Sequence, residues 1–258
     1  MNLATGVLKG SFAQGDTLTS IEGVIGSNFA DFIVGDDGHN HLEGRDGNDG
    51  LRVGDGNDSV YGGFGDDEIF AGPTDNGDTI LNGSTDAGTY RAGTGNDRVW
   101  GTNGNETIGG GGGDDTISAY GGHDRIFSSS GNDSVNAGSG KDNIFSGAGN
   151  DTVIAESGDD SLWGGDGDDR FEGGIDNDYF YFGGSRGDDV VTDFSVTEDR
   201  LDLSDALVGF ASLTDVKNVS ADSVLGGVPG LLIMTASDAS LFLERLSVSD
   251  LNEMHVIV

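Results

Sequence analysis

The chain has 258 residues, of which 48 are glycine, and its 46 acidic residues against 12 basic ones give a formal charge of −34. This charge repels nucleic acid and anionic membrane surfaces, so partners of those two kinds are excluded. Cysteine is absent, which excludes disulfides and thiolate zinc sites as a source of stability.

The N-terminal segment 1–25 precedes any repeat. Residues 1–6 lack the basic and apolar regions of a cleaved signal peptide. No apolar run in the chain reaches the ~20 residues that cross a bilayer. We therefore expect no membrane span, and export by a route other than a cleaved N-terminal signal.

Fifteen nonapeptides then follow in register, five over residues 26–70 and ten over residues 92–181. The fourth position is glycine in thirteen of them, the sixth is acidic in fourteen, and the eighth is Ile, Leu, Val or Phe in all fifteen. The polar, apolar, polar order of positions seven to nine predicts a three-residue strand with one inward side chain. Two nonapeptides then make one coil with a thin sheet on each face, so that equivalent residues two repeats apart stack.

Residues 71–91 interrupt this period. The segment is longer than two repeats, and it contains Pro73. We expect a loop or kink here, with a lapse in regular stacking, so that the roll divides into two segments.

The predicted fold is all-β. It is a parallel β-roll, a right-handed β-helix of nonapeptide repeats with two strands and two repeats per coil, closed by a β-rich C-terminal cap. The predicted regions are an N-terminal lead-in (1–25), a first roll segment (26–70), an insertion (71–91), a second roll segment (92–192) and a cap (193–258).

The acidic sixth position indicates metal binding. Aspartates two repeats apart fall on successive coils, and glycine carbonyls of the turn can complete the six to eight oxygen ligands that Ca²⁺ prefers. Aspartates that only cap their own turns are the alternative, but capping does not explain stacked acids. We expect weaker sites where Asn40 and Glu106 replace aspartate. The candidate ligands are the side chains of Asp31, Asp49, Asp58, Asp67, Asp97, Asp115, Asp124, Asp133, Asp142, Asp151, Asp160, Asp169 and Asp178, with the turn carbonyls of Gly47, Gly56, Gly65, Gly95, Gly113, Gly122, Gly131, Gly140, Gly149, Gly158 and Gly167.

The energetics of one repeat favour a role for several calcium ions in folding. One inward Ile or Val contributes roughly 1.5–3 kcal/mol, whereas ordering each backbone residue costs about 1–2 kcal/mol, and glycine lies at the upper end. Stacked carboxylates add repulsion. We therefore expect the roll to be unfolded without a cation and to fold when calcium binds.

The nonapeptides at residues 62–70 (GGFGDDEIF) and 164–172 (GGDGDDRFE) resemble the repeats-in-toxin (RTX) calcium-binding repeat, G-G-x-G-x-D-x-U-x. Residues 15–27 are similar to the strand that leads into such repeats. Residues 192–204 and 241–251 resemble the serralysin-type C-terminal secretion domain. Residues 253–258 resemble its uncleaved export signal.

The resemblance implies a secreted, extracellular protein. It would leave a low-calcium cytosol unfolded, through a type I secretion apparatus, and fold outside. It also implies that an upstream enzyme domain, such as a protease, lipase or epimerase, is a possible neighbour in a longer chain.

We expect no catalysis by this chain itself, because its four histidines form no H-E-x-x-H zinc motif and no G-x-S-x-G motif occurs. Ice binding is not favoured either, because threonine does not recur at position three.

One outward column at position nine is aromatic: Phe127, Phe145, Trp163 and Tyr181. We expect the C-terminal segment from Leu201 to Val258 to cover this column. The alternative is an adhesin or an accessory module that binds polysaccharide by stacking sugar rings on it.

Overall fold

The computed structural model describes residues 23–52, 59–65, 67–70, 79–81, 85–86, 89–90, 95–101, 103–182, 187–203, 220–236, 239–250 and 256–257. The chain divides into two compact units, Met1–Ser129 and Ser130–Val258. The lead-in predicted for residues 1–25 and the insertion predicted for residues 71–91 lie largely outside the described residues.

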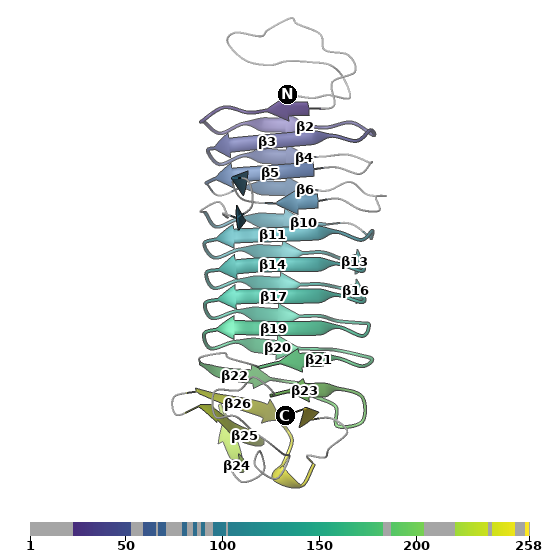
Figure 1. Ribbon diagram of the computed structural model, residues 1–258, viewed down its shortest axis with the longest axis vertical. Helices are drawn as coiled ribbons and strands as arrows, with labels where there is room; N and C mark the ends of the chain where they lie inside the picture. The colour runs from purple at the N-terminus through teal and green to yellow at the C-terminus, as the bar shows by residue number, and fades with distance from the viewer. Residues whose placement is uncertain are drawn as a thin grey trace, which may run out of the picture. The chain divides into compact units, whose positions relative to one another are not determined.

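The N-terminal unit consists mainly of short parallel strands in two sheets (Figure 1). Strands on successive coils are paired two repeats apart, as in the pairing of Gly23 with His41. One sheet has the order β1 (Gly23–Ile25), β3 (His41–Asp46), β5 (Ser59–Phe64), β7 (Thr79–Leu81), β11 (Thr107–Gly112) and β14 (Arg125–Ser130). The other has the order β2 (Phe32–Val34), β4 (Gly50–Arg52), β6 (Glu68–Phe70), β10 (Arg98–Trp100) and β12 (Thr116–Ser118). The remaining strands of the unit are β8 (Thr85–Asp86), β9 (Thr89–Tyr90) and β13 (Gly121–Gly122).

The C-terminal unit repeats this arrangement and adds an antiparallel end. β16 (Ser139–Gly140) and the 3₁₀ turn η1 (Val248–Asp250) lie outside the two main sheets. One sheet has the order β17 (Asn143–Ala148), β19 (Ser161–Asp166), β21 (Tyr179–Tyr181), β23 (Arg200–Asp202) and β27 (Val256–Ile257). The other has the order β15 (Ser134–Asn136), β18 (Thr152–Ile154), β20 (Arg170–Glu172), β22 (Asp188–Val191), β26 (Ala239–Glu244), β25 (Val228–Ala236) and β24 (Ser220–Leu225).

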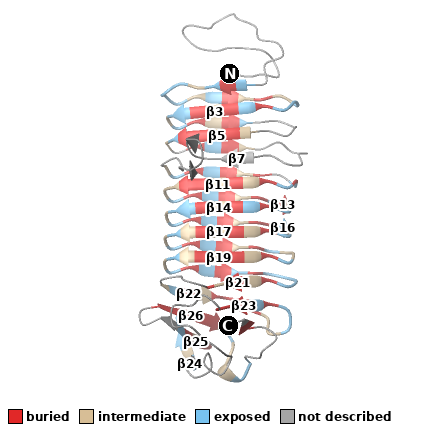
Figure 2. Cartoon of the chain, viewed as in Figure 1, coloured by how far each residue is buried: buried red, intermediate tan, exposed pale blue. Residues whose placement is uncertain are grey.

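The predicted all-β parallel roll is confirmed, and the inward position is the eighth. In every described nonapeptide from Ile33 to Phe180 that side chain is no more than 2% exposed. Figure 2 shows these buried residues in the middle of the strands. Since one apolar side chain per strand is buried against the facing sheet, each coil has a core of only two large side chains.

Strand length differs between the two faces, which the repeat did not predict. The strands β5, β11, β17 and β19 are longer than three residues, because each continues through positions one to three of the next nonapeptide. The second of those positions takes a positive φ at Gly63, Gly111, Gly147 and Gly165, a conformation open to glycine at little cost.

The break expected at residues 71–91 is not seen in the strand pairing of the N-terminal unit. β6 pairs directly with β10, Glu68 with Arg98, so the coil that contains the insertion is enlarged by twelve residues relative to a regular coil. β7 supplies its other strand and pairs with both β5 and β11. The division into two roll segments at residues 71–91 stays a prediction, since most of that segment lies outside the described residues.

Parallel pairing also continues past residue 192. β22 pairs with β20, Val190 with Arg170, and β23 pairs with β21, Arg200 with Tyr179. β26 and β27 then add in parallel to these strands, and β24–β26 form an antiparallel meander. A β-rich cap is thus present, but the roll reaches β23, inside the region predicted to be cap.

Candidate metal centre

The sixth positions form columns of buried aspartates. In the N-terminal unit, Asp49, Asp67 and Asp97 are each no more than 2% exposed. The backbone N–H of each donates to Oδ1 of the aspartate on the following coil, and the column runs across the insertion from Asp67 to Asp97. These bonds are Asp31 to Asp49 (2.7 Å), Asp49 to Asp67 (2.8 Å), Asp67 to Asp97 (2.7 Å) and Asp97 to Asp115 (2.9 Å).

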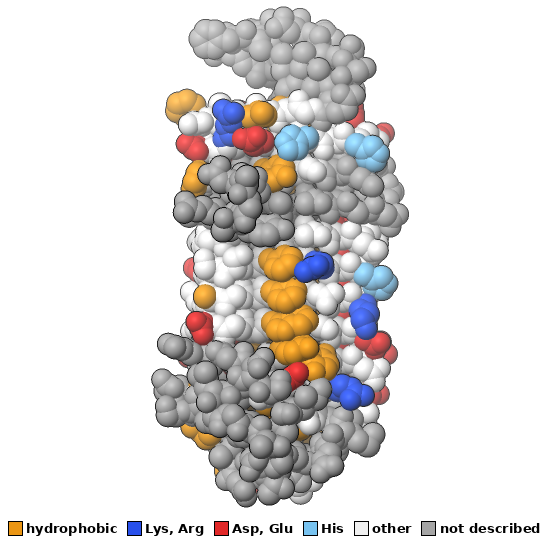
Figure 3. All heavy atoms as spheres, viewed as in Figure 1, with side chains coloured by type: hydrophobic (Ala, Val, Ile, Leu, Met, Phe, Trp, Pro, Cys, Tyr) orange, Lys and Arg blue, Asp and Glu red, His pale blue; other side chains and the backbone are white. Residues whose placement is uncertain are grey.

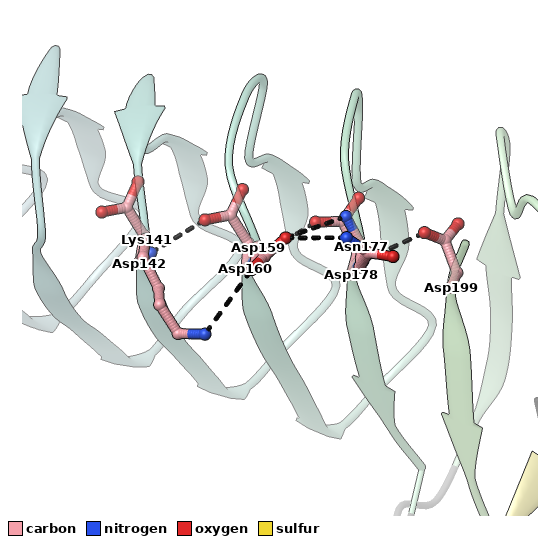
Figure 4. Close-up of polar contacts among 7 residues, drawn as sticks. All are labelled: Lys141, Asp142, Asp159, Asp160, Asn177, Asp178 and Asp199. Carbon is pink, nitrogen blue, oxygen red and sulfur yellow. Dashed lines mark hydrogen bonds and ion pairs between the residues drawn. The ribbon is translucent and has the colours of Figure 1, made fainter.

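The C-terminal unit has one such column along each edge. Figure 4 shows the second of them, in which carboxylates of successive coils follow one another. The first column bonds Asp133 to Asp151 (2.8 Å), Asp151 to Asp169 (2.9 Å) and Asp169 to Asp189 (3.1 Å). The second bonds Asp142 to Asp160 (2.8 Å), Asp160 to Asp178 (3.1 Å) and Asp178 to Asp199 (3.0 Å).

The other carboxylate oxygen of the column is buried without a hydrogen-bond donor. This holds for Oδ2 of Asp49, Asp151, Asp160, Asp169 and Asp178. A buried charged oxygen without a partner costs several kcal/mol, so its presence in five turns calls for a ligand that supplies positive charge.

The glycine at position one makes room for this oxygen. A Cβ on Gly164 would lie 2.6 Å from Asp169 Oδ2, much closer than two such atoms approach. Glycine at residue 164 therefore leaves room for the carboxylate that bends back over it, a reason that the spacing alone does not reveal.

A second ladder at position five occupies the neighbouring backbone donors. Asn177 N donates to Asp159 Oδ1 (3.2 Å), and Asn150 N donates to Asn132 Oδ1 (2.8 Å). This ladder runs opposite to the aspartate column, since its acceptor lies on the preceding coil. In these turns the N–H groups of positions five and six both donate to side chains on neighbouring coils. Neither group is therefore available to donate to Oδ2 of the aspartate.

Burial changes the acidity of the columns. It raises the pKa of Asp151, Asp160 and Asp169 to about 7 and that of Asp178 to about 8. The hydrogen bond from the preceding coil lowers each pKa, and neighbouring carboxylates raise it further. A divalent cation would reverse both the burial and the repulsion effects.

The residues fit a calcium ion better than zinc. Within the described ranges, no three His, Cys, Asp or Glu side chains converge on one point. An ion at Oδ2 would therefore take most of its ligands from backbone carbonyls, and all-oxygen coordination is the preference of Ca²⁺.

The turn glycines have the backbone that the prediction required. Gly47, Gly65, Gly149 and Gly167 have φ between +124° and +131°, and a Cβ on Gly65 or Gly149 would collide with the carbonyl of the equivalent glycine one coil earlier. Gly113, Gly122, Gly131, Gly140 and Gly158 share this conformation.

The assignment of these aspartates and glycines as calcium ligands stays a prediction. Asp58 and Gly56 lie outside the described residues. The expected pairs Asp115–Asp133 and Asp124–Asp142 have one member in each unit and stay predictions. Glu106 is buried, and its N–H donates to Asp124 Oδ1 at 2.7 Å, so it belongs to the column as a side chain one methylene longer.

Sequence reasoning missed Asp189 and Asp199, the last members of the two C-terminal columns. Residues 187–191 (GDDVV) repeat the order of positions four to eight, and this pattern was the signal that could have found Asp189. Extra residues shift the spacing from 18 to 20 and 21, so a strict nine-residue period loses them.

The aromatic column is a stack of rings in the C-terminal unit. Phe145 and Trp163 are 4.4 Å apart at 12°, and Trp163 and Tyr181 are 4.5 Å apart at 14°. Figure 3 shows hydrophobic side chains gathered on this face. All three rings are half-buried. Phe127, in the other unit, is also half-buried and lies beneath the Arg125 guanidinium, 5.3 Å from its ring centroid.

This stacking does not favour sugar binding. Sugars pack on the face of an aromatic ring, but the near-parallel rings present their faces to one another and leave mainly their edges to solvent. The rings therefore stabilise the stacking of coils. The predicted cover by Leu201–Val258 stays a prediction, because residues 204–219 and 251–255 of that segment lie outside the described ranges.

A second aromatic stack was not predicted. On the other face of the N-terminal unit, Phe70 and Trp100 are 4.6 Å apart at 4°, and the Arg52 guanidinium lies 5.1 Å from the Phe70 centroid. The enlarged coil lies between these two rings in the sequence. The nine-residue period therefore does not reveal that they stack.

The nonapeptides match one known repeat family. The profile of the RTX calcium-binding nonapeptide repeat matches residues 25–58, 51–77, 82–117, 118–153 and 145–180, more than half of the chain. No curated protein matches. Among solved structures, an extracellular lipase, LipA from Serratia marcescens, is similar at 16% identity and a TM-score of 0.23, over 94% of this chain and 40% of that one. The chain thus spans less than half of that lipase chain.

Fold and site together define a parallel β-roll whose turns carry the residues of a calcium-binding repeat. The chain belongs to the RTX calcium-binding nonapeptide repeat family. These repeats are a structural calcium-binding module and not a catalytic one.

Proposed function

We propose that this chain is a secreted structural module that binds several calcium ions along its aspartate columns and folds when they bind. The observation that carries the proposal is the buried Oδ2 that has no hydrogen-bond donor in five turns. Each such oxygen disfavours the metal-free roll, and each bound ion removes that penalty.

Each coil buries little apolar surface for the amount of backbone that it orders. This supports coupling between calcium binding and folding. Each coil buries two large apolar side chains yet orders two whole repeats rich in glycine. Because the unfolded chain holds no preformed site, calcium binding energy becomes folding energy. Extracellular calcium modules bind in the range of about 10⁻⁴–10⁻³ M, which suits a chain that stays unfolded in the cytosol.

Export through a type I secretion apparatus is part of the same proposal. Proteins with these repeats are typically secreted, and among the described residues no helix is long and apolar enough to cross a bilayer. The uncleaved C-terminal signal would lie in residues 193–258, on the end that adds β24–β27. An enzyme domain upstream is the partner that the family resemblance implies.

Asp160→Ala tests the calcium sites. Asp160 is 1% exposed, accepts from Asp142 N at 2.8 Å and has a buried Oδ2. Its removal should lower the free energy of unfolding in saturating calcium by about 3–5 kcal/mol, since it removes one partner of a buried ionic site. Calcium titrations followed by circular dichroism should show a midpoint raised at least about tenfold, which corresponds to ~1.4 kcal/mol.

The matched control is Asp159→Ala, one residue away. Asp159 is half-exposed, accepts from Asn177 at 3.0 Å and 3.2 Å, and lies 4.0 Å from Lys141 Nζ (Figure 4). Its loss should cost much less stability than the loss of Asp160, because its hydrogen bonds are exposed to water, and should leave the calcium midpoint nearly unchanged. Equal shifts for the two variants would contradict a metal site at Asp160.

A further inference from the structure

Asn40 is the described sixth position that is not acidic. Its side-chain amide forms hydrogen bonds within its own turn. Asn40 is 3% exposed. Its Nδ2 donates to the carbonyl oxygens of Asp36 (3.3 Å) and Gly38 and to Asp36 Oδ1 (3.3 Å). Its Oδ1 accepts from Asp36 N (3.3 Å). One nitrogen is thus surrounded by three oxygens of its own turn.

Those oxygens belong to positions two and four of the nonapeptide. In the turn that ends at Asp151 the same positions are Gly147 and Gly149, and position six carries a buried Oδ2 without a donor. In the first turn an N–H₂ group contacts these oxygens, whereas in the second the residue at position six is a carboxylate. A primary amide is uncharged and can donate two hydrogen bonds to carbonyl oxygens. An ionised carboxylate can donate none and brings no positive charge.

The backbone of the two turns differs accordingly. Gly149 has φ +130°, as do Gly47 and Gly131 at the same position of other aspartate turns, but Gly38 does not take a positive φ. Gly38 N also donates to Asp36 Oδ1 at 3.0 Å. The turn at Asn40 is therefore closed by its own hydrogen bonds.

We propose that the Asn40 side-chain amide takes the place of a calcium ion, so that the turn Gly35–Asn40 is complete without metal. This inference rests on the proposed function, in which the aspartate turns bind calcium. It replaces the expectation of a weaker site at Asn40 with no site at all. The roll then contains one turn whose closure is independent of calcium, next to coils that require it.

Two reciprocal substitutions test the inference by calcium stoichiometry, measured by equilibrium dialysis and by titration calorimetry on the full chain. Asn40→Asp should bind one more calcium ion per chain than the parent, since it restores the carboxylate and removes the internal donor. Asp151→Asn should bind one ion fewer but keep the far-UV circular dichroism of the parent in saturating calcium, because the new amide closes the turn.

Asp151→Ala is the control for Asp151→Asn. It should also lose one ion, but its thermal midpoint should fall well below that of Asp151→Asn because alanine supplies no N–H group. An unchanged stoichiometry for Asn40→Asp, or equal destabilisation by asparagine and alanine at residue 151, would overturn the inference. A parent chain that binds no calcium would instead overturn the proposed function on which it rests.

Discussion

In excess chelator at about pH 8, the chain should lose its β-sheet structure, and millimolar calcium should restore it. At that pH the buried carboxyls of Asp151, Asp160 and Asp169, with pKa values of about 7, are largely ionised. Each buried charge without a partner costs several kcal/mol. Since a domain is stable by only about 5–15 kcal/mol, a few such groups suffice to unfold it. Far-UV circular dichroism and small-angle scattering measure the change.

Magnesium is the control cation for this experiment. It requires near-ideal octahedral geometry and dehydrates reluctantly, so a turn built from glycine carbonyls should not fold around it at the same concentration. A chain that is equally compact in chelator, magnesium and calcium would contradict calcium-dependent folding.

Acidification should partly replace calcium in the metal-free chain. The raised pKa values of the column mean that the folded state holds protons more tightly than the unfolded state, whose aspartates titrate near 3.8. Stability from these groups is therefore fully present below about pH 4 and is lost as the pH rises through 7–8. A rise from 3.8 to about 7, as for Asp160, corresponds to about 4 kcal/mol.

The measurement is circular dichroism in chelator while the pH is lowered from about 8 to about 5. The metal-free chain should gain β-structure on this path, and its calcium affinity should fall because protons and calcium compete for the same carboxylates. Asp160→Ala should weaken the acid effect and Asp159→Ala should not. A metal-free chain that loses order as the pH falls would contradict buried carboxyls as the source of its instability.

The repeat itself was predictable from the sequence because each of its positions has a separate physical requirement. The buried eighth position, the glycine turns and the parallel pairing two repeats apart all follow from one nine-residue pattern. The pattern failed where the spacing changed. The column passes from Asp67 to Asp97 across the enlarged coil, and Asp189 and Asp199 follow at spacings of 20 and 21, because residues inserted between two strands do not disturb the pairing of those strands.

The chemistry of the site was predictable only in part. Spacing showed that Asp151 and Asp169 are neighbours, but not that Oδ1 is held by a backbone N–H while Oδ2 is buried without a donor. It also did not show that Trp163 presents its faces to two other rings. Both facts depend on side-chain rotamers and packing, which the repeat pattern does not specify.

The most direct measurement is anomalous X-ray diffraction from crystals of the chain grown in millimolar calcium. Peaks within coordination distance of Oδ2 of Asp49, Asp151, Asp160, Asp169 and Asp178, and none in the turn at Asn40, are the expected result. Turns without anomalous density beside those oxygens would contradict the claim that calcium stabilises the roll.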